Sequence, residues 1–435
     1  MCQEINQQLM NFIDHAPTAF HAIDQIKQKL LKGGYQELLE SEEWNLKQDG
    51  RYFVVRNDSS ILAFRIPNKS CQSFMIGAAH SDSPSFKLKE NPEMEKEGYL
   101  ELNVEGYGGM LMAPWFDRPL GIAGRLIVKK DHQFSTYLVD SNEAIALIPN
   151  LAIHMDRSAN ENHSYHIQKD LMPVFAQGKK ESIINYLSEK LGLEEETVLA
   201  HDLFLYPYQK SYIWGLHKEF LSAAHLDDLQ CAFANVYGFL SAHDSTSIPV
   251  MVIFDNEEVG SLTKQGADST FLTDCLSRIY QALENDMHGF AKAIANSMMV
   301  SADNAHGIHP NYMSKHDPIN HPKLNGGVVI KYNANQHYTT DAISAALFKD
   351  ICRQENIPIQ TFVNHSDVRG GSTLGNISNA HVSLITVDIG LAQWAMHSPM
   401  ETAGVRDTEY LINALAAFYS RTLYQNRKGY ELCKK

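Results

Sequence analysis

The chain has 435 residues, which is long enough for two or three domains or for one large domain with an insertion. Its hydrophobic content of 44% and charged content of 20% are those of an ordinary globular protein, so we expect a sizeable core. The net charge of −14 argues against nucleic acid or an anionic membrane as the main partner.

The six cysteines are scattered along the chain, without the CxxC spacing of a zinc knuckle. We expect them to be reduced thiols rather than a disulfide framework. Residues 1–10 lack a basic segment followed by an apolar one, and no uninterrupted apolar run is as long as a membrane span. These features predict a soluble cytoplasmic protein.

The N-terminal part predicts two amphipathic helices followed by strands. The helices cover residues 4–14 and 18–32, and Thr18 is a candidate cap for the second. The strand-like runs lie within residues 52–64 and 73–79, and the second of them leads directly into His80 and Asp82. Residues i and i+2 of a strand share a face, so Asp82 is placed to accept the spare imidazole N–H of His80, as carboxylates do beside metal-bound histidine.

The middle of the chain is rich in strand patterns. Alternating apolar residues and many glycines between residues 98 and 140 indicate the start of an inserted β-rich domain. The same region continues through residues 148–157, and a helix is predicted for residues 181–191. The chain returns to the main domain near residue 219.

The run Val250 to Phe254 is short, apolar and rich in β-branched residues, which is typical of a strand buried on both faces in a mixed or parallel sheet. Asp255, Glu257 and Glu258 follow at its C-terminal end, where open α/β sheets place their sites. If this segment is extended, Glu257 and Glu258 point to opposite sides. One of them can then bind a cation while the other faces a water molecule beside it.

Three more segments carry a carboxylate or a histidine next to a predicted element. Asp227 precedes a helical stretch at residues 230–240, where an aspartate can also be a simple helix N-cap. Asp303 ends the apolar run that begins at Met298, and His397 lies beyond a strand at residues 382–388. Other predicted elements are a strand at residues 327–332 and helices at residues 341–355 and 401–425.

Together these groups suit a pair of divalent metal ions, because they combine two histidines with several carboxylates, each at the end of an element. In a two-metal hydrolase one carboxylate bridges ions that lie roughly 3.5–4 Å apart, and the ions activate a shared water. A glutamate that is not a ligand then moves the proton of that water to the leaving amine. The candidate groups are His80, Asp227, Glu257, Glu258, Asp303 and His397.

Long motifs follow one another along the chain, among them Ala79-His80-Ser81-Asp82-Ser83-Pro84, Trp115-Phe116-Asp117-Arg118-Pro119-Leu120 and Leu226-Asp227-Asp228-Leu229, with others at residues 148–157, 255–261, 301–312, 331–338 and 396–398. In this order they resemble the aspartyl aminopeptidase family of di-metal exopeptidases. The resemblance implies that Asp227 bridges the two ions and that His80, Glu258, Asp303 and His397 are the other ligands. It also implies that Glu257 is the general base and that Asp82 orients His80. The expected ions are zinc, with cobalt or manganese as alternatives.

The resemblance further implies the architecture and the assembly. An α/β catalytic domain with a mixed sheet is formed by residues 1–89 and 221–435, and a β-rich dimerisation domain is inserted at residues 90–220. Dimers assemble into a tetrahedral dodecamer, in which His154 enters the active site of a neighbouring subunit. A cis peptide bond is expected between Asp227 and Asp228.

We therefore expect an aminopeptidase that acts on peptide substrates, without a nucleic acid or membrane partner. Lys331 and Tyr338 are the expected substrate-binding residues, and Lys331 is the cation that would meet an acidic N-terminal side chain; a structural lysine at a strand end is the alternative. His225 adds a potential ligand outside the family pattern. Two other functions remain open from the sequence: a di-metal deacylase or carboxypeptidase-like amidohydrolase, and a self-assembling scaffold without catalysis.

Overall fold

The structure is a computed structural model that describes residues 2–68, 73–161, 163–178, 181–193, 197–243, 245–284, 287–368 and 370–434. Its largest element is a mixed nine-stranded sheet in the order β1-β2-β3-β13-β4-β14-β18-β16-β17. The strands are β1 (Gln36–Glu37), β2 (Arg51–Arg56), β3 (Ser60–Arg65), β4 (Phe74–His80), β13 (Ile248–Phe254), β14 (Met298–Ala302), β16 (Val328–Tyr332), β17 (Ile359–Val363) and β18 (Ile385–Gly390). The predicted mixed-sheet α/β class is confirmed.

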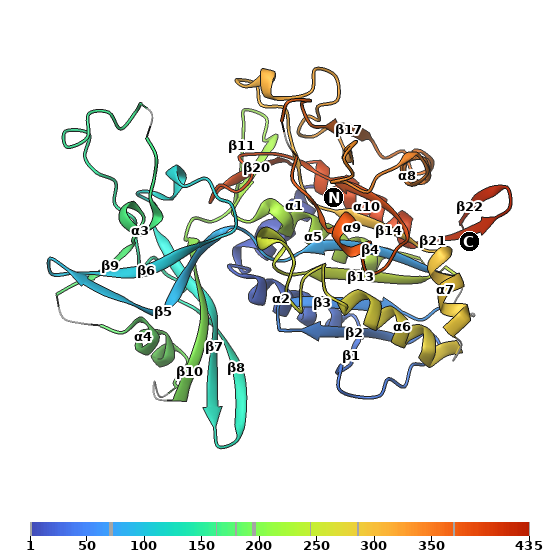
Figure 1. Ribbon diagram of the computed structural model, residues 1–435, viewed down its shortest axis with the longest axis horizontal. Coiled ribbons are helices and arrows are strands. Elements are labelled where there is room, and N and C mark those ends of the chain that lie inside the picture. Colours follow the sequence, from blue (N-terminus) through green and yellow to red (C-terminus); the bar gives the residue numbers. More distant parts are fainter. Residues whose placement is uncertain are drawn as a thin grey trace.

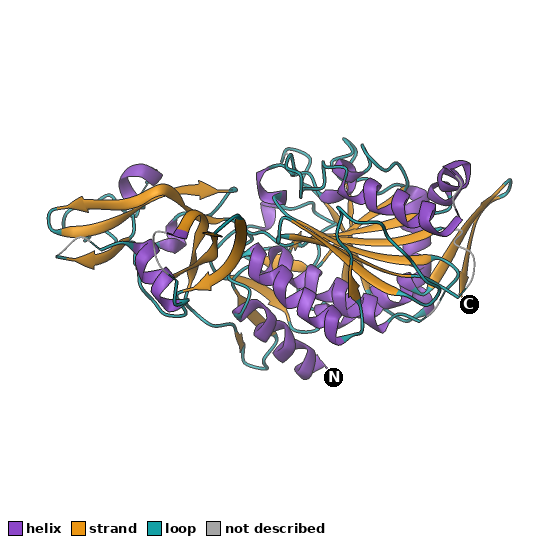
Figure 2. Cartoon of the chain, turned by 90° about the horizontal axis from the view of Figure 1, so that it is seen from below, coloured by secondary structure: helices purple, strands orange, loops and turns teal. Residues whose placement is uncertain are grey.

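Helices cover both faces of this sheet (Figure 2). One face packs against α1 (Cys2–Asp14), α2 (Ala19–Lys32), α5 (Leu226–Ser241), α8 (Ala342–Gln354) and α10 (Asp407–Tyr419). The other packs against α6 (Phe271–Glu284), α7 (Met287–Ala295) and α9 (Leu374–Ser378). Along β13, Met251 and Ile253 join the first core, whereas Val250 and Val252 join the second. The strand is therefore apolar throughout because alternate side chains enter two different cores.

A second sheet of six strands lies beside this body (Figure 1). Its order is β8-β7-β10-β5-β6-β9, and its strands are β5 (Ser85–Lys96), β6 (Tyr99–Tyr107), β7 (Leu120–Lys130), β8 (Gln133–Asp140), β9 (Val174–Gln177) and β10 (Val198–Pro207). It has its own apolar core, which includes Phe86 and Trp115, and carries α3 (Ile167–Asp170) and α4 (Ile183–Lys190). The sheet begins at Ser85, directly after the segment that holds His80 and Asp82.

A third sheet, in the order β11-β12-β20-β19-β15, closes one end of the main body. Its strands are β11 (Tyr212–Trp214), β12 (Phe220–Ala223), β15 (Ala305–His306), β19 (Ala392–Trp394) and β20 (Glu401–Gly404). A hairpin of β21 (Arg421–Asn426) and β22 (Gly429–Lys434) projects near the C-terminus (Figure 1). Single 3₁₀ turns lie at η1 (Ala113–Trp115), η3 (Glu257–Val259) and η4 (Met313–Lys315).

The helix predicted for residues 401–425 is wrong at both ends. Residues 401–404 pair with β12 and β19 as strand β20, the helix covers only Asp407–Tyr419, and Arg421 begins another strand. A Cβ added at Gly404 would lie 2.4 Å from the backbone nitrogen of Asn325, so this close backbone approach requires glycine. Pairing with β12 and β19 thus makes residues 401–404 a strand, although their sequence pattern favours a helix.

No helix in the described ranges is long and apolar enough to cross a membrane.

Candidate metal centre

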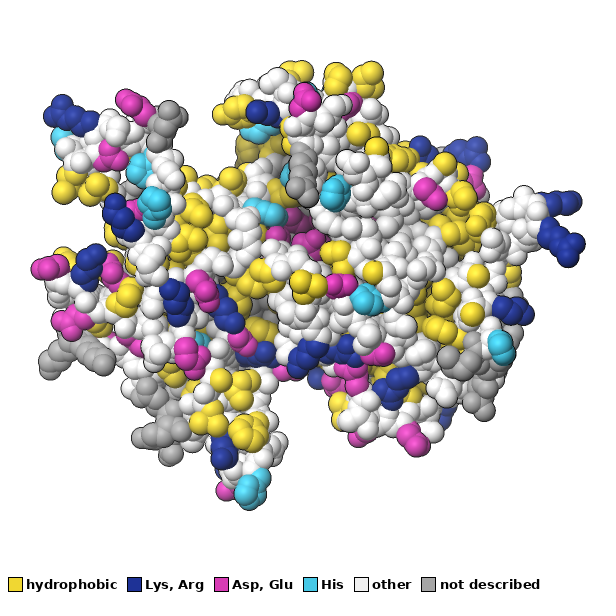
Figure 3. All heavy atoms as spheres, in the orientation of Figure 1, with side chains coloured by type: hydrophobic (Ala, Val, Ile, Leu, Met, Phe, Trp, Pro, Cys, Tyr) yellow, Lys and Arg dark blue, Asp and Glu magenta, His cyan; other side chains and the backbone are white. Residues whose placement is uncertain are grey.

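The predicted site residues converge at the carboxyl ends of three adjacent parallel strands. β13 and β14 flank β4 and run parallel to it, and Phe254 pairs with His80 at the end of the strands. His80 ends β4, Asp303 follows β14, and Glu257 and Glu258 follow β13. Asp227 comes from the start of α5, and His397 from the turn between β19 and β20. The space-filling view shows acidic side chains in a hollow near the centre of the molecule (Figure 3).

The donor atoms fall into three groups within which all atoms lie within 4.8 Å of one another. These groups are His80 with Asp227, Asp228 and Asp303; His80 with Glu257 and Glu258; and Asp227 with Glu258 and His397. Every residue expected to bind metal is present in at least one group. Asp227 connects the group that contains Asp303 to the group that contains His397.

The Asp227 carboxylate lies between two imidazoles. Its Oδ1 is 3.5 Å from Nε2 of His80, and its Oδ2 is 3.3 Å from Nε2 of His397. Burial raises the pKa of Asp227, but the contacts with His397 and His80 outweigh burial and hold this pKa below its ordinary value. The two oxygens of one buried carboxylate thus lie near different imidazoles, which is the arrangement that a bridging carboxylate needs.

The remaining carboxylates are crowded and poorly solvated. Burial, together with the neighbouring carboxylates Asp303 and Glu258, raises the pKa of Glu257 well above its ordinary value. Burial raises the pKa of Glu258 to about 7, and Oδ1 of Asp227 and Oε1 of Glu258 accept no hydrogen bond. Buried acceptors without a donor are costly, and a cation satisfies them. Nitrogen and oxygen donors of this kind fit zinc.

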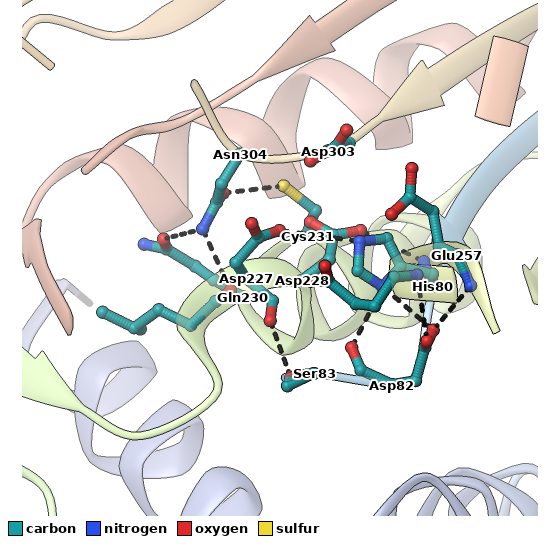
Figure 4. A network of polar contacts seen from close by, with 12 residues as sticks. His80, Asp82, Ser83, Asp227, Asp228, Gln230, Cys231, Glu257, Asp303 and Asn304 are labelled. Atoms are coloured by element: carbon teal, nitrogen blue, oxygen red, sulfur yellow. Dashed lines mark hydrogen bonds and ion pairs between the residues drawn. The ribbon is translucent and has the colours of Figure 1, made fainter. Parts of the chain in front are cut away.

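The segment carrying Glu257 and Glu258 is not extended, contrary to the prediction. Asn256 adopts a left-handed backbone (φ 61°) and starts the 3₁₀ turn Glu257–Val259. A carboxylate oxygen of Glu257 and one of Glu258 lie within 4.8 Å of each other, so the two side chains do not point to opposite sides. The turn is held by Asp82, whose Oδ1 and Oδ2 accept the backbone N–H groups of Glu257 and Glu258, both at 3.1 Å. Figure 4 shows Asp82 below His80 with these contacts drawn.

Asp82 also contacts His80, as the sequence predicts. Its Oδ1 lies 3.3 Å from Nδ1 of His80, and its backbone carbonyl lies 3.1 Å from the same nitrogen. Nε2 of His80 is thereby directed at Asp227. The geometry matches a histidine ligand whose second nitrogen is fixed by a carboxylate.

Lys331 is buried next to Asp303. Its Nζ donates to the backbone carbonyls of Asp303 and Asn304 at 2.8 and 3.2 Å and lies 3.3 Å from Oδ2 of Asp303. Burial lowers the pKa of Lys331, but the charge of Asp303 more than offsets this effect, so the pKa lies above its ordinary value. The ring of Tyr338 lies 5.2 Å from the ammonium group. Lys331 therefore has a structural role, which is the alternative that the sequence left open for it, because its ammonium group holds the loop of Asp303 in place.

Two predicted histidines lie outside the donor groups of the described residues. His154 sits in an exposed turn of the segment between β8 and α3. His225 has a left-handed backbone (φ 55°) and occupies the N-cap position of α5, and burial lowers its pKa to about 4. Asp227 and Asp228 therefore do not cap this helix; they lie in its first turn with non-helical backbone angles, and the expected cis bond joins them.

Sequence reasoning missed Glu401, a fully buried carboxylate. Its Oε2 accepts the backbone N–H of Asp227 at 2.9 Å, and its Oε1 accepts that of His397 at 2.7 Å. Burial and the charge of Asp227 raise the pKa of Glu401 well above its ordinary value. In the sequence, only the position of Glu401 four residues after His397 pointed to this role, and the helix predicted for residues 401–425 hid that relationship. Asp228 was also missed as a residue that could bind a metal ion. Its Oδ2 accepts the backbone N–H of His80 at 3.1 Å.

Comparisons with known proteins agree with this centre. The family described as "Aminopeptidase I zinc metalloprotease (M18)" matches residues 12–419. A protein of Clostridium novyi named "Probable M18 family aminopeptidase 2" is 43% identical over 423 residues, which cover 95% of this chain and 98% of that protein.

Solved structures show the same fold. The cryo-EM structure of the Ape4 and Nbr1 complex has a TM-score of 0.93 at 33% identity and covers 96% of this chain and 86% of that one. The S. cerevisiae mApe1 dodecamer has a TM-score of 0.85 at 27% identity and covers 96% of both chains. Together with the family match over most of the chain, these similarities identify an aminopeptidase rather than a deacylase or a scaffold without catalysis. The chain belongs to the M18 family of zinc aminopeptidases.

Proposed function

We propose that this aminopeptidase uses two zinc ions, held on either side of Asp227, and that it prefers peptides with an acidic N-terminal residue. The observation that carries the two-ion assignment is the Asp227 carboxylate, whose oxygens lie 3.5 and 3.3 Å from the imidazoles of His80 and His397. The residues that we assign as ligands are His80, Asp227, Glu258, Asp303 and His397.

When bound, the zinc ions would polarise the scissile carbonyl and lower the pKa of the attacking water. Glu257 is the general base in this proposal. It takes a proton from that water and delivers it to the leaving amine of the peptide bond. Two features support this role: Glu257 lies in the donor group of His80 and Glu258 without being one of the assigned ligands, and Asp82 fixes its backbone.

The acidic preference is supported by Lys331. It is a buried cation beside Asp303, one of the assigned ligands, and it remains charged because its pKa is raised. A substrate carboxylate close to Lys331 and Tyr338 would gain charge attraction that a neutral side chain lacks.

We further propose that the enzyme is a homo-oligomer in which residues 90–220 form the inserted dimerisation domain and His154 completes a neighbouring subunit's site. The segment that holds His154 exposes Leu151, Ile153 and Met155, at 57%, 47% and 75% of their surface. Such a cluster of large apolar side chains favours contact with another subunit. The tetrahedral arrangement of dimers and the cytoplasmic location stay predictions from the sequence.

A substrate panel tests the function. Anilides of Asp, Glu, Ala, Leu and Lys are compared after exhaustive removal of metal and after reconstitution with zinc, with N-acetylated aspartate anilide as the control that lacks a free amine. We expect activity only in the reconstituted enzyme, highest kcat/KM for Asp or Glu, and none on the acetylated substrate. Full activity without metal excludes the zinc mechanism, and equal rates on Asp and Leu substrates exclude the acidic preference.

A further inference from the structure

Tyr107 is the last residue of β6, and its hydroxyl reaches from the six-stranded sheet into the support of the metal centre. The hydroxyl donates to Oδ2 of Asp82 at 2.7 Å and accepts from Nδ2 of Asn256, also at 2.7 Å. Asp82 follows β4 and Asn256 follows β13, both in the nine-stranded sheet. One hydroxyl therefore joins two sheets.

The contact with Asp82 completes the bonding of that carboxylate. Asp82 already accepts the N–H groups of Glu257 and Glu258 and lies 3.3 Å from Nδ1 of His80. A carboxylate offers about four lone-pair sites, and Tyr107 occupies the remaining one. Without the hydroxyl, a buried carboxylate loses a donor and is free to reorient relative to its other three partners.

The second contact of the Tyr107 hydroxyl is with Asn256, which, like Asp82, supports the turn that carries Glu257 and Glu258. Asn256 starts the turn that presents Glu257 and Glu258, and its Oδ1 accepts from Thr263 and Gln265 at 2.7 and 2.8 Å. Its Nδ2 is therefore the group that connects the turn to Tyr107.

The six-stranded sheet fixes where the hydroxyl lies. The Tyr107 ring packs edge-on against Phe204 of β10, with centroids 5.6 Å apart. The next residue, Gly108, has a φ of 73°, and a Cβ added there would lie 3.1 Å from Cβ of Glu258. The end of β6 thus passes directly against the turn that carries this predicted ligand.

We propose that Tyr107 is a positioning residue through which the inserted sheet sets the geometry of the metal centre. By fixing Asp82 and Asn256, it determines the orientation of His80 and of the turn that carries Glu257 and Glu258. The proposal rests on the roles assigned above to these three residues. Burial and the charge of Asp82 raise the pKa of Tyr107 far above its ordinary value, which favours the protonated hydroxyl that donates to Asp82.

The test compares Tyr107→Phe with Tyr206→Phe, which removes an equivalent bond. The Tyr206 hydroxyl donates to Oδ1 of Asp140 at 2.6 Å within the same sheet, and both tyrosines are half-buried. Full-length zinc-loaded proteins are measured for kcat and KM on aspartate anilide, for zinc retention against a competing chelator, and for melting temperature and oligomeric state.

We expect Tyr107→Phe to lower zinc affinity or kcat by about 10–100-fold with KM changed less than about twofold, as for other residues that orient metal ligands. Tyr206→Phe keeps both quantities within about twofold of wild type. Wild-type zinc retention and kcat in Tyr107→Phe, or equal losses in the two variants, overturn the proposal. A finding that Glu257 is not the base leaves the zinc-retention result intact, so the two proposals fail separately.

Asn256→Asp provides a second variant from the other side of the contact. It replaces the donating amide by an acceptor that competes with Asp82 for the Tyr107 hydrogen, while Tyr107 itself and the shape of residue 256 are kept. The same loss of zinc retention is expected. Normal zinc retention in this variant contradicts the proposal, even if Tyr107→Phe fails to assemble.

Discussion

The carboxylate of Glu401 accepts the backbone N–H of Asp227 across 174 residues of sequence, and the same carboxylate accepts the N–H of His397. Glu401 thereby fixes the backbone of two residues that we assign as metal ligands, the bridging Asp227 and His397. It is the counterpart of Asp82, which holds the backbone of Glu257 and Glu258. Two buried carboxylates outside the assigned ligand set thus hold the loops of the metal centre in place.

Replacing Glu401 with Gln should weaken metal binding. The amide has one acceptor oxygen, so one of the two N–H groups loses its partner while the side chain keeps its size. We expect about 10–100-fold weaker zinc retention. Chelator competition followed by elemental analysis measures it, with Glu43→Gln, an exposed glutamate, as the control. Unchanged zinc retention in Glu401→Gln would show that these two hydrogen bonds do not matter for the centre.

Replacing Glu257 with Gln should abolish most turnover while zinc and fold are kept. The amide matches the shape of the carboxylate but cannot take a proton, so the loss, about 10²–10⁴-fold, belongs in kcat rather than KM. Steady-state kinetics on aspartate anilide and zinc content are measured together. Near-normal kcat with zinc bound would exclude Glu257 as the base.

The sequence predicted the parts of the centre that follow from local pattern. Val250 to Phe254 reads as a doubly buried strand because its alternate residues face two cores, and His80 is the last residue of a strand of the same kind. The positions of Asp227, Asp303 and His397 next to predicted elements made them candidates, the resemblance to a known family assigned them as ligands, and the structure brings them together.

What the sequence could not predict depends on contacts between distant segments. Glu401 acts through backbone N–H groups, which have no sequence signature, and pairing with β12 turns its segment into a strand. The turn at Glu257 follows from the left-handed backbone of Asn256, which tertiary contacts with Tyr107 and Gln265 support. Thr18 occupies the predicted N-cap position of α2, yet its hydroxyl bonds Nδ1 of His21 instead of a backbone N–H.

The buried side chain of His21 makes the free energy of unfolding depend on pH. Burial lowers the pKa of His21 below its ordinary value of 6.5, with Asp140 and Asp24 opposing the effect. The unfolded chain therefore binds this proton at higher pH than the folded one. The contribution of His21 to stability is complete above pH 6.5 and is lost as the pH falls from there through the lower pKa of the folded state. His21→Gln should flatten the loss of stability between pH 7 and pH 5.

Denaturant unfolding of the zinc-loaded protein at each pH measures this effect. His132→Gln, at an exposed position in the β7–β8 turn, serves as the control because it removes a histidine without changing the buried site. If His21→Gln and wild type lose stability in parallel over this pH range, while both remain folded, protonation of His21 does not contribute.

The last prediction is that His154 acts in a neighbouring subunit. An imidazole donor opposite the zinc ions would stabilise the oxyanion that forms on the scissile carbonyl, and losing one such donor costs about 10²–10³-fold in kcat. His154→Ala and Glu257→Gln homo-oligomers should therefore both be nearly inactive. In a mixed dimer, one site has an intact Glu257 and receives His154 from its partner. Co-expression of the two variants should recover a substantial fraction of the wild-type rate.

A second mixture separates action between subunits from action within one. The double variant His154→Ala/Glu257→Gln is co-expressed with wild type under separate affinity tags, and oligomers that carry both tags are purified. If His154 acts across the interface, the wild-type subunit of a mixed dimer loses its donor and that dimer is inactive. If His154 acts within its own subunit, the wild-type subunit keeps its full rate, and the first mixture stays as inactive as its parents. The two mixtures thus change in opposite directions under the two arrangements, so a general loss of stability cannot imitate either result.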